Sequence, residues 1–488
     1  MSSEASDAAT GGGEGTRLRS GTVGMWDLVF FVVAAAAPLS VMSGVSPLAI
    51  QFGGLGAPGG YLVAGIVMAV FAIGFTAMSR YVRNAGAFYA YISKGFGRTV
   101  GVGAAFVAVL SYVAITIGFV PALGVFAHDT FASVFGIDLP WTVWALLGLV
   151  IVAWLGYHQI ALSAKILGVL LILEVVVLLV LAVPVLLSGG EHGLSVDGFA
   201  PSHVFGPHVG ALFVLSFGAF LGFESTAIYS EEAKDPRRTV RRATFVAVGF
   251  LAIFYTLIVW VGIMAYGPDQ ALRAAADDPT GMFFVAMERW VGSGATDAMH
   301  VLIVTSTLAA TLAFHNASSR YLHALGREGV LPRGLATAGA KTGAPVVASL
   351  TVTVLTIVVV GVSAAFGAKP YEQIFLWTNG PGILGLIMLM ALCSAAVVAY
   401  FRRSPHDASL VQRVFAPALA CATLSATSVL IVKNFDLLTA ADSTTNVLLI
   451  GTLPVAFVIG IGVALRIRSR DREAFQRLTT TSIAEVEA

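Results

Sequence analysis

Apolar runs long enough to cross a lipid bilayer recur along the whole chain. A helix needs about 20 consecutive apolar residues to span the hydrocarbon core. Backbone polar groups within lipid must also be satisfied inside the chain, which leaves helices as the simplest structure for such runs. The sequence therefore predicts an all-α integral membrane protein with twelve transmembrane helices, at residues 25–52, 58–79, 100–127, 141–158, 162–187, 208–231, 242–266, 297–325, 346–367, 371–400, 411–433 and 446–466.

Composition agrees with this class and argues against several others. Of 488 residues, 57% are hydrophobic and 11% are charged, whereas a soluble domain has roughly 25% charged residues. A formal net charge of +1 gives no indication of nucleic acid as a partner. The two cysteines, Cys393 and Cys421, lie in apolar runs and form neither a disulfide framework nor a metal motif. We expect no cofactor and no bound metal.

The loops give the orientation and the domain limits. If the N-terminus is cytoplasmic, the inside loops and ends hold 23 of the 28 Lys and Arg residues, the bias that sets the topology of membrane proteins. Both ends are therefore predicted to be cytoplasmic, in a multi-pass protein of the cell (inner) membrane. The predicted divisions are a disordered tail (1–23), a first repeat (24–207), a second repeat (208–403), two further helices (404–467) and a C-terminal tail (468–488).

Two spans carry interruptions at matching places. The first contains "SVMSGVSPLAI", with the break expected at Ser43–Pro47, and the sixth contains "AFLGFESTA", with Gly218 and Gly222 near its centre. Five spans separate these stretches, so the second enters the membrane in the opposite direction. That arrangement indicates an inverted repeat with a binding site at the two breaks. Taken singly, each stretch is also compatible with a proline kink or a helix-packing glycine.

Broken helices suit a zwitterionic ligand. Free N–H groups and the positive dipole end of the half-helix near Gly44 can hold a carboxylate. Exposed carbonyl groups at both breaks can hold an ammonium group. A small molecule with an amine and a carboxylate on one carbon matches that pair.

Three stretches resemble a known family. "GVSPLAIQFGGLGAPGG", "SFGAFLGFESTAIYSEEAKDPRRTVRRA" and "SRYLHALGREGVLP" are similar to segments of the amino acid–polyamine–organocation (APC) superfamily, in its bacterial amino acid permease branch. The resemblance implies a LeuT-like 5+5 inverted repeat with broken helices 1 and 6, two additional C-terminal helices, and amino acid substrates. It implies that Ser43, Gly44 and Val45 supply backbone amides that bind the substrate carboxylate. It also implies that Phe220, Leu221 and Gly222 supply carbonyl groups or walls of the substrate pocket. Some relatives have a bulky aromatic residue where this chain has Gly218, which argues against guanidinium substrates stacked on that ring.

Two ionisable residues within the spans are candidates for proton coupling. Glu224 follows the second break, where a carboxylate must be partnered, protonated or hydrated. It is either a proton-sensitive group linked to closure or a neutral acid bonded to freed backbone. Lys165 either extends to the inner headgroups or lies inside, facing a polar stripe in the eighth span that ends near Ser319. The resemblance of Ser163-Ala164-Lys165 to proton-coupled relatives favours the inner position, which would make sodium unnecessary.

Three other features each allow more than one role. Glu174 lies half a turn away from Lys165 on the same helix and reaches the substrate path or another helix, or is a protonated structural acid. The polar stripe comprises Thr307, Thr311, His315 and Ser319, with His315 expected to be a satisfied hydrogen-bonding group. The segment Trp377–Gly382 indicates either another helix break, as a pocket wall or an outer gate, or a simple kink.

The predicted function is secondary active transport of amino acids across the plasma membrane by alternating access, with proton symport. Exchange of one amino acid for another fits the same residues, and a channel or sensor of the same fold is a weaker alternative. An enzyme is not expected, because the chain has no HExxH, GxSxG or Walker A motif. The predicted partners are an amino acid, a proton and the lipid bilayer, and the sequence does not indicate the oligomeric state.

Overall fold

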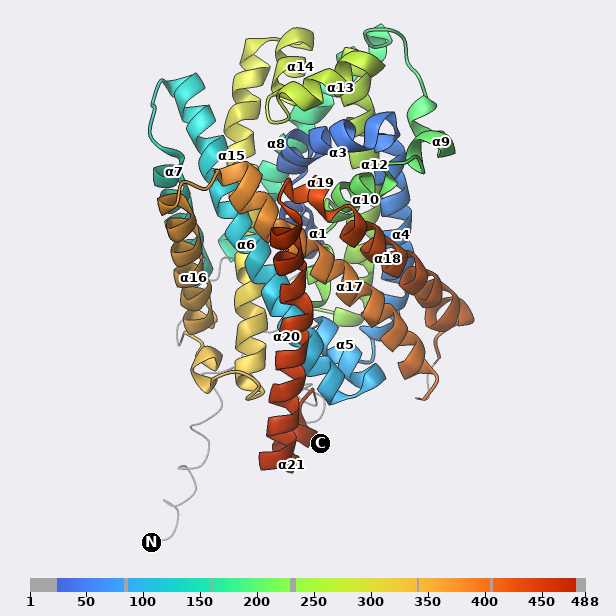
Figure 1. Ribbon diagram of the computed structural model, residues 1–488, viewed down its shortest axis with the longest axis vertical. Coiled ribbons are helices and arrows are strands. Elements are labelled where there is room, and N and C mark those ends of the chain that lie inside the picture. Colours follow the sequence, from blue (N-terminus) through green and yellow to red (C-terminus); the bar gives the residue numbers. More distant parts are fainter. Residues whose placement is uncertain are drawn as a thin grey trace.

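The structure is a computed structural model that describes residues 24–82, 87–158, 161–228, 234–339, 342–403 and 407–479, with side chains at 87, 161–167, 227–228 and 236–237 excepted. The predicted tail 1–23 and the Lys165 side chain therefore lie outside the described residues. Across the described ranges the regular structure is entirely helical. Long helices run roughly along the longest axis of the molecule, with α13 and α14 at one end and α5 and α21 at the other (Figure 1).

The helices follow one another through short connections. In chain order the α-helices are α1 (Met25–Ala35), α2 (Pro38–Ser40), α3 (Ser46–Gly53), α4 (Ala57–Met78), α5 (Ala87–Phe96), α6 (Arg98–Phe135), α7 (Trp141–Tyr157), α8 (Ala161–Ser188), α9 (Pro201–Val204), α10 (Val209–Gly218), α11 (Ser225–Ile228), α12 (Pro236–Tyr266), α13 (Pro268–Asp277), α14 (Met282–Trp290), α15 (Ser293–Arg327), α16 (Val346–Ala365), α17 (Leu376–Phe401), α18 (Ala416–Lys433), α19 (Phe435–Thr439), α20 (Ser443–Arg470) and α21 (Arg472–Arg477). Three π-helical turns are η2 (Val41–Val45), η7 (Pro370–Phe375) and η8 (Val411–Phe415). Three 3₁₀ turns are η3 (Gly54–Gly56), η4 (Asp197–Phe199) and η6 (Arg333–Ala336).

Within the described residues, nine helical segments are long and apolar enough to cross a membrane. One of them, Met25–Met78, contains the first two predicted spans. The predicted spans 141–158 and 208–231 coincide with shorter apolar helices, α7 and α10, of which α10 stops at a break. Within the described residues the all-helical membrane architecture is thus confirmed, and the number of twelve spans stays a prediction.

The first break lies seven residues earlier than the sequence indicated. Helix α1 ends at Ala35, Ala37 has a left-handed backbone (φ 42°, ψ 69°), and α2 begins at Pro38. Proline has no N–H group and disfavours an α conformation in the residue before it, so the chain breaks here.

The expected break at Ser43–Pro47 is a correction. Val41–Val45 form a π-helical turn that continues directly into α3 at Ser46. The Ser46 hydroxyl donates to the carbonyl oxygen of Met42 over 2.6 Å. Pro47 stands in the first turn of α3, where a missing N–H costs little. The chain therefore widens at this segment without losing its helical path.

The second break is where the sequence predicted it. Helix α10 ends at Gly218, residues 219–224 form successive turns, and α11 begins at Ser225. Gly222 has φ +110°, a conformation that residues with a side chain rarely adopt. The two breaks meet, because a Cβ atom placed on Gly222 would lie 3.0 Å from Cβ of Ala35.

The core is built around the long helices α6 and α15, which pack against each other. α1 packs against α8, α12 and α15, so the first break is enclosed by protein on several sides. The Trp377–Gly382 segment lies inside a continuous α17 that contains Pro381, which agrees with a kink and not with a break. Nδ2 of Asn379 donates to the carbonyl oxygen of Phe375 over 2.9 Å in this first turn.

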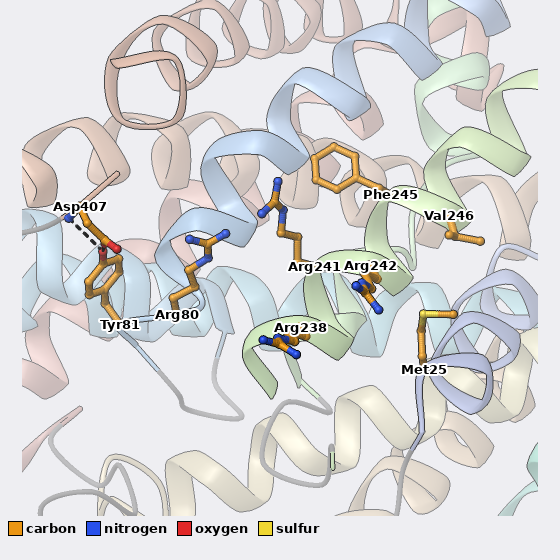
Figure 2. A pocket seen from close by; sticks show the side chains of 9 residues that line it. All are labelled: Met25, Arg80, Tyr81, Arg238, Arg241, Arg242, Phe245, Val246 and Asp407. Carbon is orange, nitrogen blue, oxygen red and sulfur yellow. Dashed lines mark hydrogen bonds between the residues drawn. The ribbon is translucent and has the colours of Figure 1, made fainter. Parts of the chain in front are cut away.

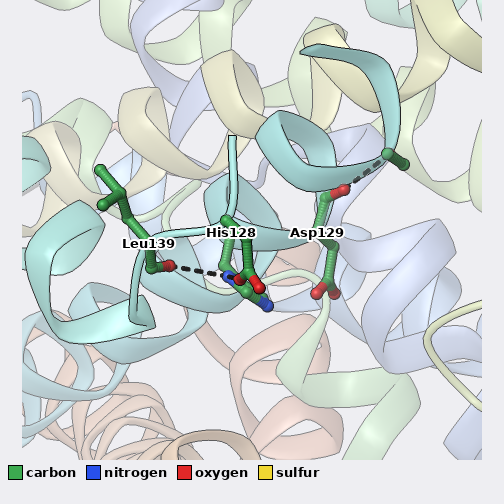
Figure 3. Close-up of polar contacts among 5 residues, drawn as sticks. His128, Asp129 and Leu139 are labelled. Carbon is green, nitrogen blue, oxygen red and sulfur yellow. Dashed lines mark hydrogen bonds and ion pairs between the residues drawn. The ribbon is translucent and has the colours of Figure 1, made fainter. Parts of the chain in front are cut away.

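The connection between α6 and α7 is held by a side-chain to backbone contact (Figure 3). Nδ1 of His128 donates to the carbonyl oxygen of Leu139 over 2.8 Å, and Asp138 lies 3.8 Å from the same nitrogen. Short connections of this kind keep the ends of neighbouring helices at one level. They fix α7 beside α6, on the outer side of the helices that carry the breaks (Figure 1).

Candidate functional site

A small cavity lies between the two breaks. The volume of this cavity is about 50 Å³. Its walls come from the first break and π turn, from α6, from the second break, and from α15 and α17. The lining residues are Ala35, Ala36, Val41, Val45, Ile115, Phe119, Leu215, Gly218, Ala219, Leu221, Phe314, Phe375, Asn379 and Ile383.

The chemistry of this cavity is almost wholly apolar. Among its lining residues, Asn379 is the one with a polar side chain, and none carries a charge. Phe119 and Phe314 stack with ring centroids 5.6 Å apart, and Phe375 meets Phe119 edge to face at 5.8 Å. An aromatic and aliphatic wall with one amide at its edge suits an apolar group.

Two of the predicted substrate residues, Val45 and Leu221, line the cavity, and Gly218 does so as well. Phe220 instead packs edge to face against Tyr255, with ring centroids 5.8 Å apart. Gly222 lies at the contact with Ala35 described above. The structure thus brings both predicted segments to one place, although only part of each faces the cavity.

Ser43 and Gly44 lie in the π turn behind this wall. Ser43 is fully buried, and its hydroxyl has no hydrogen-bond partner among the described residues. The carbonyl oxygen of Gly44 accepts a hydrogen bond from the Tyr371 hydroxyl over 3.0 Å. A Cβ atom on Gly44 would lie 2.8 Å from that hydroxyl oxygen, so this position accepts glycine alone without displacement of Tyr371.

Glu174 caps the first break. Its Oε2 atom accepts hydrogen bonds from the Leu39 N–H over 3.3 Å and from the Ser306 hydroxyl over 2.7 Å. The Ser40 N–H donates in turn to Ser306 Oγ over 3.4 Å. Glu174 is 3% exposed. Of the N–H groups freed by the break, that of Leu39 is therefore bonded to the Glu174 carboxyl group and that of Ser40 to the Ser306 hydroxyl, so Glu174 reaches other helices, α2 and α15.

Other polar groups at the first break, including a backbone carbonyl, also have hydrogen-bond partners. The Tyr255 hydroxyl, from α12, donates to the carbonyl oxygen of Ala36 over 2.7 Å. The hydroxyl groups of Ser40 and Thr307 lie 2.6 Å apart in a hydrogen bond. Buried backbone groups that lose their helical partners need such replacements. Side chains of α8, α12 and α15 thus fix the geometry of an interrupted helix.

Glu224 plays the matching part at the second break. One of its carboxyl oxygens accepts the Gly222 N–H over 2.9 Å, and the other accepts the Tyr112 hydroxyl over 2.9 Å. Glu224 is fully buried. Tyr112, which lies on α6, therefore ties the second break to that helix.

The polar stripe of α15 is present, with Thr307, Thr311, His315 and Ser319 all buried. Thr307 reaches the first break through Ser40, and Nε2 of His315 lies 3.0 Å from the Thr353 hydroxyl oxygen. Whether the stripe faces Lys165 stays a prediction, because that side chain lies outside the described residues.

Comparison with known proteins gives consistent relatives. A branched-chain amino acid permease, BcaP of Lactococcus lactis subsp. cremoris, is 27% identical over 336 residues, which are 64% of this chain and 70% of that protein. The lysine-specific permease LysP of the same organism is 25% identical over 299 residues, covering 58% of this chain and 56% of that one. The low-affinity putrescine importer PlaP of Escherichia coli is 25% identical over 291 residues, covering 56% and 61%.

This chain thus spans less than two thirds of the length of LysP and PlaP. All three relatives are named as permeases or importers, and none as an enzyme. The sequence model of the family described as "Amino acid permease" matches residues 27–474, which is most of the chain. Together with its many apolar helices, this match shows a multi-pass membrane protein that belongs to the amino acid permease family of the APC superfamily.

Proposed function

We propose that this protein is a secondary active transporter that carries an amino acid across the cell membrane by alternating access. The observation that supports this most is the cavity that lies between the two helix breaks. Broken helices around a closed central site are the usual construction of carriers, whereas a channel needs a continuous pore.

The proposed substrate is an amino acid with an aliphatic side chain. The cavity has no charged lining residue, and a lysine or diamine ammonium group buried in it would lack a counter-charge. The named substrates of the three relatives are branched-chain amino acids, lysine and putrescine. Of these chemistries, the apolar wall around Val45, Leu221 and Phe314 favours the first.

For the polar part of the substrate, we propose the segments at the two breaks. The Ser43, Gly44 and Val45 segment would face the carboxylate, and the unpartnered Ser43 hydroxyl supports this assignment. Carbonyl groups near Phe220, Leu221 and Gly222 would face the ammonium group. Since Glu174 already accepts the Leu39 N–H and Ser306 accepts the Ser40 N–H, the substrate carboxylate must use amides further along the turn.

The proposed architecture is twelve crossings in a LeuT-like 5+5 inverted repeat, followed by two additional helices. Residues 24–207 and 208–403 would form the two repeats, and residues 404–467 would form the last two helices. The protein would lie in the cell (inner) membrane, with both termini in the cytoplasm. The position of the breaks on α1–α3 and α10–α11, in the first helix of each proposed repeat, supports this division.

We further propose proton coupling without sodium, with Lys165 and Glu224 as the proton-sensitive groups. Exchange of one amino acid for another would use the same cavity and remains the second candidate. Glu224 connects the Gly222 backbone to Tyr112 on α6, so a change in its protonation would alter the contacts that hold the second break. This coupling is the mechanistic core of the proposal.

Uptake into liposomes tests the proposal. Purified protein is reconstituted, and labelled leucine, lysine and putrescine are supplied under an inward pH gradient, a sodium gradient or neither. We expect leucine uptake that responds to the pH gradient alone, with lysine and putrescine carried at least roughly tenfold more slowly, because an unpaired charge in an apolar site costs several kcal/mol. Uptake that requires sodium would contradict proton coupling, and uptake driven only by internal amino acid would favour exchange.

Lys165→Ala belongs to the same experiment. It is expected to abolish the response to the pH gradient while leaving the folded protein in the membrane, as judged by size-exclusion chromatography. Lys94→Ala, in the last turn of α5, serves as the matched control. Unchanged transport by the Lys165 variant would make this lysine a surface anchor.

A further inference from the structure

A large open pocket lies away from the cavity, at the ends of α1, α4 and α12 (Figure 2). Its volume is about 1030 Å³. Arg80 follows the end of α4, Met25 is the first residue of α1, and Arg238, Arg241 and Arg242 lie in the first turns of α12. The complete lining is Met25, Arg80, Tyr81, Arg238, Arg241, Arg242, Phe245, Val246 and Asp407.

The charge of this pocket is strongly positive. Four of its nine lining residues are arginines, and Asp407 is the single acid among them. The Asp407 carboxylate accepts a hydrogen bond from the Tyr81 hydroxyl, which raises the pKa of Tyr81. The N-terminus of α12 lies on the same side, where the Asp235 carboxylate caps it and lies 4.0 Å from the Arg238 guanidinium group. Guanidinium groups grouped in this way match the oxygens of a phosphate group.

The pocket also has an apolar wall. Phe245 and Val246 stand one turn beyond Arg242 along α12, and they are 36% and 40% exposed. On the same helix Ile253, two turns further, is 73% exposed, so this face of α12 is directed away from the protein core. A cluster of arginines followed by exposed apolar side chains along a membrane helix matches an amphiphile with an anionic head.

We propose that this pocket binds the phosphate headgroup of an anionic phospholipid, with an acyl chain lying along Phe245 and Val246. A free phosphate ion would use the arginines but would gain nothing from the apolar wall. The position of the pocket, at the ends of α1, α4 and α12, places its arginines at the depth of lipid headgroups if these helices cross the bilayer. The proposal concerns a different surface from the substrate cavity, and the two share no lining residue.

The test uses purified full-length protein in detergent. Dioleoyl-phosphatidylglycerol, dioleoyl-phosphatidylcholine and inorganic phosphate are titrated separately, and the thermal unfolding midpoint and native mass spectra report binding. We expect phosphatidylglycerol alone to raise the midpoint and to remain bound in the mass spectra. Arg241→Gln/Arg242→Gln is expected to weaken the apparent affinity for phosphatidylglycerol by at least roughly tenfold, since each basic residue near an anionic lipid contributes about 1 kcal/mol.

The matched control is Arg468→Gln/Arg470→Gln, which removes two exposed arginines from the end of α20. It is expected to bind phosphatidylglycerol like the wild type. Equal loss in both double variants would show a nonspecific charge effect, and no loss in the α12 variant would show that these arginines do not bind the headgroup; either result would overturn the proposal. A midpoint shift with inorganic phosphate alone would also overturn it in favour of a soluble anion. If the glutamine variant does not fold, Arg241→Lys/Arg242→Lys keeps the charge, loses the bidentate geometry, and is expected to bind more weakly than the wild type.

Discussion

Gly222→Ala is expected to reduce amino acid uptake at least roughly tenfold, because a non-glycine residue in such a backbone conformation costs about 1–3 kcal/mol. Gly222 has φ +110°, and its missing side chain allows the second break to touch Ala35 of the first. A methyl group there would press on the Ala35 Cβ at 3.0 Å and shift the N–H group that Glu224 accepts. The measurement is the initial rate of labelled leucine uptake into liposomes, normalised to folded protein.

Gly249→Ala is the matched control for this substitution. Gly249 lies within α12, and a Cβ atom on it has nothing within 4 Å. Because alanine is favoured over glycine in a helix, this variant should transport like the wild type and be at least as stable. Wild-type uptake by Gly222→Ala would show that the contact between the two breaks has no part in transport.

Glu174→Ala is expected to lower both stability and uptake. Removal of the carboxyl group leaves the Leu39 N–H and the Ser306 hydroxyl without their acceptor in the protein interior. Each buried donor left unsatisfied costs about 1–3 kcal/mol. We expect a clear fall in the thermal unfolding midpoint and a loss of leucine uptake of at least roughly tenfold, since the helix end at the substrate cavity loses its cap.

Glu174→Gln separates the cap from the charge. Both hydrogen bonds end on the same oxygen, Oε2, so the single carbonyl oxygen of glutamine can accept them both. We expect this variant to keep most of the wild-type stability and uptake. An equally severe loss in the glutamine and alanine variants would show that transport needs the ionisable group itself, which would make Glu174 a proton carrier and not a cap.

The membrane class could be predicted from sequence because it depends on local composition. Apolar runs of sufficient length are helices in lipid whatever their neighbours are. The second break was also predictable, since Gly222 is a residue whose backbone freedom the turn requires. The number of full-length spans is harder to predict from sequence than the membrane class, because a helix that is interrupted at Gly218 is shorter than the apolar run that contains it.

The first break was misplaced because two prolines compete and sequence does not weigh their surroundings. Both Pro38 and Pro47 free a carbonyl group within one apolar run. At Pro47 the neighbouring Ser46 hydroxyl and a widened turn restore continuity. At Pro38 the Leu39 N–H is accepted by Glu174 and the Ala36 carbonyl oxygen accepts from Tyr255, both from helices far away in the sequence. Only the tertiary structure shows which proline has such distant partners, although Pro38 itself was a visible signal.

The cavity walls illustrate the same limit. Phe314 and Phe375 line the cavity together with Leu221, yet nothing in their local sequence distinguishes them from other aromatic residues of long helices. Their roles follow from how α15 and the η7 turn pack against α6. Sequence periodicity can place a residue on a helix face, but which neighbour that face meets is decided by the packing of the whole bundle.

Whether the two breaks surround the substrate can be seen in a cryo-electron microscopy structure of the protein in lipid nanodiscs with saturating leucine. We expect density for leucine in the cavity, with its side chain against Phe314 and Leu221 and its polar end toward the π turn at Val41–Val45. Density for leucine elsewhere, or helices that run unbroken through Ala36–Ala37 and Gly218–Glu224, would contradict this expectation.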